Sequence, residues 1–169
     1  MIMEISDEVL KKIPIFSGIK EEHLKNLKRI IQIQEFPENA VVIREGEKGK
    51  EIYILLNGEV EVSKSLVLNL PGLEQKEKSL TKLSADGFPF FGEMVLFDDK
   101  AERTATVITT TKCLFAVLKK SDILNLAESD AEIGYLLFKN IASALASRLK
   151  KANNDILKLT TALSLILSR

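Results

Sequence analysis

The sequence is poor in the residues on which most metal sites and nucleophilic catalytic sites depend. It has one histidine, one cysteine and no tryptophan in 169 residues. Zinc and iron centres collect several histidine or cysteine ligands, and a nucleophile needs a nearby base, for which His23 is the only imidazole. We therefore expect no metal site and no catalytic residue. We expect His23, in the polar segment 21–24, to be a solvated helix residue.

The sequence also lacks net charge and long apolar runs. Its 24 basic and 24 acidic residues cancel, so no overall field favours nucleic acid or an anionic membrane surface. The apolar run 162–167 is far shorter than the roughly 20 residues needed to span a membrane. Residues 1–8 carry acids where a signal peptide needs basic and apolar regions, which predicts a cytoplasmic protein.

The single cysteine, Cys113, excludes an internal disulfide bond. It precedes the apolar run 114–118, and free cysteine is among the most often buried residue types. We expect a buried structural thiol rather than a reactive one.

The first part and the middle of the sequence differ in periodicity. From Ser6 to about Ile31, apolar residues recur at helical spacing and are interrupted at Pro14 and Gly18, which predicts two helices joined by a loop. Short β-branched or alternating segments separated by glycines follow, at 41–43, 52–56, 60–62, 80–83 and 106–108. Between two of them, Asn57-Gly58 predicts a hairpin with a type I′ turn, because both residues tolerate a positive φ. Many short strands predict a roll or barrel.

The last part of the sequence is helical, with apolar residues at unbroken three-four spacing. These positions are Tyr135, Phe138, Ala142, Leu145, Leu149, Ala152, Ile156, Leu159, Leu163 and Ile166. The pattern is typical of the seam of a two-stranded coil and predicts a homodimer. The alternative, a helix packed on its own domain, would account for the first turns near Tyr135. We divide the chain into residues 1–125, a β-roll with N-terminal helices, and residues 126–169, a dimerisation helix of the same domain.

The segment 90–107 carries the strongest functional signal, because it combines a carboxylate and a guanidinium around one short apolar turn. We expect a strand end at 90–91, a helical turn over 93–97 and a strand resuming near Thr104. Gly92 permits close approach of a ligand, the N–H groups that open the turn favour an anion, and Arg103 offers a fork of donors to phosphate. Glu93 can accept a hydroxyl proton. The combination suits a ribose joined to a phosphate.

This segment resembles the phosphate-binding cassette of cyclic-nucleotide-binding domains, as found in bacterial cAMP receptor regulators and in regulatory subunits of protein kinase A. The ten-residue step from Glu93 to Arg103 resembles the bacterial version. The glycine-punctuated segments 43–49 and 52–60 resemble the opening strands of the family's β-roll. The resemblance implies an α+β fold: an antiparallel, jelly-roll-like β-roll with N-terminal helices and a long C-terminal helix.

The resemblance also implies roles for individual residues. Glu93 would take the ribose 2'-hydroxyl, Arg103 and Thr104 the cyclic phosphate, and Gly92 a backbone contact. Asn153 falls near the level at which polar residues of the long helix meet the adenine in the bacterial regulators. The neighbouring Ala152 departs from that pattern and leaves cAMP versus cGMP open.

The predicted function is therefore a cyclic-nucleotide sensor, for cAMP first, that signals through its C-terminal helix to an unidentified downstream protein. In the bacterial regulators a helix-turn-helix follows the long helix, and none follows it here, so we expect no direct DNA binding. The alternative is a vestigial module that serves dimerisation or docking without ligand, with Glu93 and Arg103 in an ion pair. Segment 63–83 departs from the compact family pattern, and we expect a long hairpin with its tip near 68–73.

Overall fold

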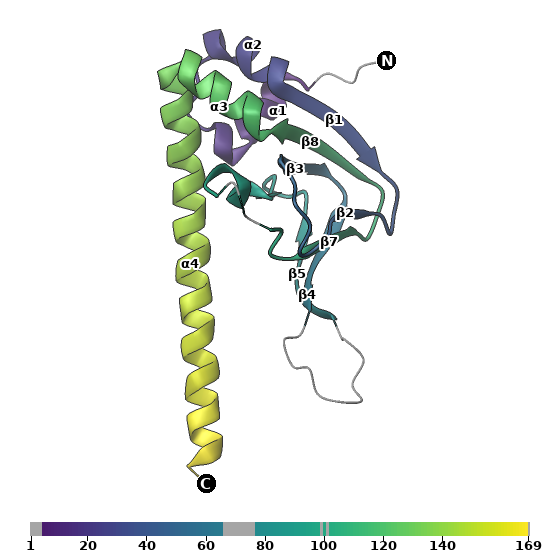
Figure 1. Cartoon of the computed structure of the whole chain (residues 1–169), viewed down its shortest axis with the longest axis vertical. Helices are drawn as coiled ribbons and strands as arrows, with labels where there is room; N and C mark the ends of the chain where they lie inside the picture. The colour runs from purple at the N-terminus through teal and green to yellow at the C-terminus, as the bar shows by residue number, and fades with distance from the viewer. Residues whose placement is uncertain (1–4, 66–76, 99, 101, 169) are drawn as a thin grey trace.

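The computed structural model describes residues 5–65, 77–98, 100 and 102–168. N-terminal helices are followed by two four-stranded antiparallel sheets and then by a long C-terminal helix (Figure 1). This arrangement confirms the expected α+β fold. The expected hairpin tip at 68–73 lies outside the described residues.

The N-terminal helices are α1 (Asp7–Lys12), the 3-10 turn η1 (Pro14–Phe16) and α2 (Glu21–Ile30). The hydroxyl of Ser6 accepts a hydrogen bond from the N–H of Val9 at 3.3 Å and caps α1. Pro14 cannot donate a backbone hydrogen bond, so α1 ends before it and η1 begins at it. The two predicted helices are confirmed.

The strands form two sheets, in which neighbouring strands of the described residues pair antiparallel. One sheet has the order β1-β8-β3-β6 and the other β2-β7-β4-β5. The bounds are β1 Ile31–Phe36, β2 Val41–Ile43, β3 Glu51–Asn57, β4 Glu59–Ser65, β5 Glu77–Ser84, β6 Phe90–Phe91, β7 Thr106–Thr109 and β8 Cys113–Lys119.

Strand β8 lies between two apolar layers, which explains its nearly continuous hydrophobic sequence. Ala116 and Leu118 pack in the cluster shared with the helices, whereas Phe115 and Val117 pack in the cluster between the sheets. Side chains alternate between the two faces of a strand, so one strand contributes to both layers. Cys113 is 1% exposed in the second layer, and the expected buried thiol is confirmed.

The prediction of a hairpin at Asn57-Gly58 is wrong. Strands β3 and β4, which flank these residues, belong to different sheets, and Gly58 alone of the two has a positive φ. A Cβ at Gly58 would lie 2.6 Å from both the sulfur of Cys113 and the carbonyl oxygen of Lys112. The glycine is therefore required where the chain passes from one sheet to the other.

The C-terminal part contains α3 (Lys120–Ser129) and α4 (Ala131–Leu167). The first turns of α4 bury Ile133, Leu137 and Ile141 against the domain, and the Asn140 amide donates to the carbonyl of Ser17 at 2.8 Å. From residue 146 to 168 every residue is exposed, and this part of α4 extends along and beyond the roll (Figure 1). Within the described residues, no helix is long and apolar enough to cross a membrane.

Candidate functional site

The segment predicted to bind phosphate has the expected local structure. Strand β6 ends at Phe91, Gly92 adopts a left-handed conformation with φ 84°, and the 3-10 turn η2 (Glu93–Leu96) follows. A Cβ at Gly92 would lie 2.6 Å from Nη1 of Arg103 and 2.9 Å from the carbonyl oxygen of Glu51. Any other residue here would therefore be strained in its backbone and would displace the arginine.

Arg103 is buried, at 8% exposure, and is held mainly by backbone oxygens. Its Nη1 donates to the carbonyl of Gly92 at 3.2 Å and its Nη2 to the carbonyl of Glu51 at 2.9 Å. The Glu51 carboxylate lies 3.7 Å from Nη2. Gly49 packs so closely on the guanidinium that a Cβ there would collide with it. These contacts use Nη1 and Nη2 and leave the Nε–H of the donor fork available to an anion.

Glu93 is also buried, at 6% exposure, and it pairs with a residue of α4. Its Oε1 accepts a hydrogen bond from Nη1 of Arg148 at 2.9 Å, and the side chain of Arg148 is 45% exposed. The alternative reading expected an ion pair between Glu93 and Arg103. Each of them has a different charged partner in the structure, Arg148 and Glu51.

Arg148 is the residue of this site that sequence reasoning missed. Besides Glu93 it contacts Phe90, whose carbonyl accepts from Nη2 at 2.5 Å and whose ring lies 4.6 Å from Cζ. A guanidinium over an aromatic face is a favourable cation–π contact. The sequence does contain a pattern that indicates it. Ile141 and Leu145 belong to the face of α4 that packs on the domain, and the next position on this face, at three-four spacing, is Arg148.

These residues meet at a cavity of about 160 Å³. Of the predicted site residues, Gly92, Glu93, Arg103 and Thr104 line it, together with Arg148. Thr104 is exposed at its edge. Asn153 is exposed on α4 and is not among the residues that line the cavity. The structure thus brings together the predicted phosphate and ribose contacts but not the predicted base contact.

An aromatic residue, Phe91, lines the cavity. Tyr53 stacks on Phe91 with ring centroids 6.0 Å apart. Burial raises the pKa of the Tyr53 hydroxyl, and the nearby Glu51 carboxylate adds to this effect. Tyr53 therefore stays neutral, and Arg103 and Glu93 are the buried charged side chains that line the cavity in the described part of the chain.

The expectation that His23 is a solvated helix residue is wrong. It lies on α2, as expected for its sequence, but its side chain is 19% exposed and Nδ1 lies 2.6 Å from Oδ2 of Asp130. Spacing on α2 alone could not reveal a partner 107 residues away. In the described residues, no group of three or more His, Cys, Asp or Glu is arranged to hold a metal ion.

Comparison with known proteins agrees with this geometry. The model of the cyclic nucleotide-binding domain matches residues 33–130, which is more than half of the chain and includes the whole of the segment described above. The match extends from within β1 to the residue that precedes α4.

Individual relatives come from both bacteria and eukaryotes. A CRP-like cAMP-activated global transcriptional regulator of Mycobacterium tuberculosis is 27% identical over 150 residues, 89% of this chain and 61% of the regulator. A cAMP-dependent protein kinase regulatory subunit of Pyricularia oryzae is 32% identical over 115 residues, 68% of this chain and 26% of the subunit. The crystal structure of the Thermus thermophilus catabolite activator protein is 25% identical, with a TM-score of 0.72 over 87% of this chain and 63% of that one. The chain spans less than two thirds of each relative.

Proposed function

Because the chain belongs to the cyclic nucleotide-binding domain family, we propose that the cavity between η2, β7 and α4 binds a cyclic nucleotide, and cAMP in particular. Domains of this family are generally sensor modules without catalytic activity. The observation that carries the proposal is the pair of buried, opposite charges, Arg103 and Glu93, that line one cavity. The names of the relatives, which are cAMP-activated or cAMP-dependent, support cAMP.

The ligand's phosphate and sugar match the two charges. The cyclic phosphate lies against Arg103, the hydroxyl of Thr104 and the backbone of Gly92, where the buried guanidinium of Arg103 makes a charge-assisted hydrogen bond. The 2'-hydroxyl of the ribose donates to Glu93. The base points toward α4, where Asn153 lies about 7.5 Å of helical rise and about 140° of rotation beyond Arg148, so that a movement of α4 or a second copy of the helix must bring it to the base.

Signalling arises because Arg148 and the ribose hydroxyl compete for the carboxylate of Glu93. In the structure its Oε1 is bonded to Arg148 of α4, and in the proposed complex the ribose hydroxyl takes this position. The nucleotide then favours an arrangement of α4 in which Arg148 has left the carboxylate. A ligand shifts such an equilibrium only by its differential affinity for the two states, typically about 1 to 3 kcal/mol.

The second half of α4 supports a homodimer as the form in which the domain works. Leu149, Ile156, Leu159, Leu163 and Ile166, all positions of the predicted seam, are between 55% and 71% exposed. A second copy of the helix would bury them in a two-stranded coil.

Ending the chain after Lys150 tests this role. The truncated protein keeps Glu93, Arg103 and Arg148 but loses most of the exposed seam, so light scattering should show a monomer where the full chain is a dimer. It should still bind the nucleotide, but more weakly, because the surface near Asn153 is gone. A truncated protein that stays dimeric with full affinity contradicts both parts of the proposal.

Titration calorimetry of the full chain with cAMP and with cGMP tests the central proposal. We expect saturable binding of cAMP. Mass spectrometry of the purified protein should detect any nucleotide that copurifies with it. The absence of binding for both nucleotides, with no copurified ligand, would overturn the sensor function in favour of a docking module.

A further inference from the structure

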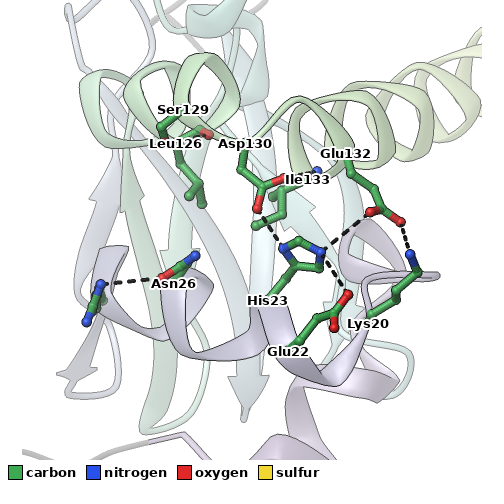
Figure 2. Close-up of polar contacts among 10 residues, drawn as sticks. Lys20, Glu22, His23, Asn26, Leu126, Ser129, Asp130, Glu132 and Ile133 are labelled. Carbon is green, nitrogen blue, oxygen red and sulfur yellow. Dashed lines mark hydrogen bonds and ion pairs between the residues drawn. The ribbon is translucent and has the colours of Figure 1, made fainter.

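The only histidine of the chain, His23 on α2, contacts residues at the start of α4. Figure 2 shows the ring of His23, on α2, between carboxylates of two elements. Nδ1 lies 2.6 Å from Oδ2 of Asp130, and Nε2 lies 3.5 Å from Oε1 of Glu22 and 3.5 Å from Oε2 of Glu132. Both ring nitrogens therefore face negative oxygen.

A neutral imidazole cannot satisfy this arrangement. It carries one N–H donor and one bare nitrogen that accepts, and only the imidazolium donates from both sides. Lys20 pairs with Glu132 at 2.8 Å and adds a positive charge to the cluster (Figure 2). No charged side chain of α1 or α3 pairs with the ring in the part of the chain that the structure describes.

Asp130 connects the ring to the geometry of α4. It is the N-cap residue of this helix, and its Oδ1 accepts a hydrogen bond from the N–H of Ile133 at 3.2 Å. This bond lowers the pKa of Asp130, with His23 adding to the effect, and Lys20 lowers the pKa of Glu132. Both carboxylates stay ionised between about pH 5 and 8, the range in which imidazole changes its charge.

We propose that His23 is a proton-operated latch between α2 and the junction of α3 and α4, closed by the imidazolium and loosened by the neutral ring. We assign the change to a proton, since the described residues contain no cluster of His, Cys, Asp or Glu arranged to hold a metal ion. The protonated ring has partners at both nitrogens in the folded chain and only water in the unfolded chain. The imidazolium therefore stabilises this contact in the folded chain, and the neutral ring does not.

Hydrogen exchange at the backbone amides of Ile133 and Gly134, in the first turn of α4, tests the latch without nucleotide. Protection factors, which correct for the intrinsic effect of pH on exchange, should fall about two- to tenfold between about pH 5.5 and 8, the ratio expected for one hydrogen bond. The ring resonances, which are unambiguous because the chain has one histidine, report the charge state of the ring in the same samples.

Three variants define the result. His23→Asn keeps a neutral donor near the position of Nδ1, and Asp130→Asn keeps a capping oxygen but removes the charge; both should give protection that is flat with pH. Glu128→Gln removes an exposed carboxylate two residues before Asp130 and should behave like the wild type. Flat protection in the wild type, an unchanged slope in His23→Asn or a ring that keeps one charge state would each overturn the proposal. None of these outcomes depends on nucleotide binding.

Discussion

The cavity has two walls, and each places an arginine against it in a different way. On the β-roll side, Arg103 is 8% exposed, bonded to two backbone carbonyls and packed against glycines. On the helix side, Arg148 has a side chain that is 45% exposed, and it reaches the cavity from the point where α4 leaves the domain. Arg103 is buried in the roll, whereas Arg148 reaches the same cavity from a half-exposed position and contacts Glu93 and Phe90.

In the proposed function, the β-roll wall binds the ligand and the helix wall responds to it. A group held by backbone oxygens needs no reorganisation when a ligand arrives, so its interaction contributes fully to affinity. A group on a partly exposed helix can leave at small cost, so its displacement can report that the ligand is bound. Substitutions at the two walls should therefore differ both in size and in sign.

Removing Arg103 should have the largest effect. Arg103→Leu deletes the charge-assisted contact to phosphate and leaves the ligand's charge partly buried and unpaired, so calorimetry should show cAMP binding weakened by about 2 to 5 kcal/mol. Arg44→Leu is the matched control, because Arg44 has an exposed side chain that pairs with Glu47 on the surface. Equal affinity in Arg103→Leu and wild type would disprove the phosphate assignment.

Removing the carboxylate between the two walls should have the next largest effect. Glu93→Ala loses a hydrogen bond to a charged group, worth about 1.5 to 3 kcal/mol, when the ligand is cAMP. With a 2'-deoxy analogue the hydroxyl is already absent, so wild type and variant should bind about equally.

Wild type and Glu93→Ala, each measured with cAMP and with the 2'-deoxy analogue, form a thermodynamic cycle. Its coupling energy measures the contact between Glu93 and the ribose hydroxyl. A variant that still discriminates against the deoxy analogue as strongly as the wild type shows that Glu93 is not the ribose contact.

The β-roll wall could be predicted from the sequence because its residues are close in the chain. Gly92, Glu93 and Arg103 lie within 12 consecutive residues, and the turn between them is set by local backbone preferences. The partners of α4 could not be predicted in this way. Glu93 and Arg148 are 55 residues apart, and His23 and Asp130 are 107 apart, so each pair depends on where the helix docks.

Two errors in the fold have local causes. Residues 31–36 alternate as a strand does and form β1, which is missing from the predicted strands because the apolar Ile30 and Ile31 also fit the helical spacing of α2. Asn57-Gly58 has the composition of a hairpin turn, yet β3 pairs with β8 and β6 rather than with β4. Turn chemistry shows that the chain bends there but does not show which strand lies beside it.

Replacing Arg148 on α4 should have the smallest effect, and it should strengthen nucleotide binding rather than weaken it. Arg148→Gln leaves the buried Glu93 without its ion-pair partner, and glutamine has nearly the same helix propensity as arginine. Breaking a fully buried pair costs about 3 to 5 kcal/mol and an exposed one about 0 to 1. With one partner half exposed, the free energy of unfolding without nucleotide should fall by about 1 kcal/mol.

The nucleotide-bound protein should lose almost none of this stability, because the ribose hydroxyl has already taken the place of Arg148 on Glu93. The substitution thus destabilises the ligand-free protein more than the complex. By linkage, this difference adds to the binding free energy, so cAMP should bind Arg148→Gln roughly fivefold more tightly than wild type. Lys150→Gln removes an exposed cation two positions further along α4 and should change neither quantity. Thermal unfolding with and without cAMP, together with calorimetry, measures both. Weaker binding by Arg148→Gln would mean that the arginine stays with the nucleotide, so that the helix wall binds the ligand instead of being released by it.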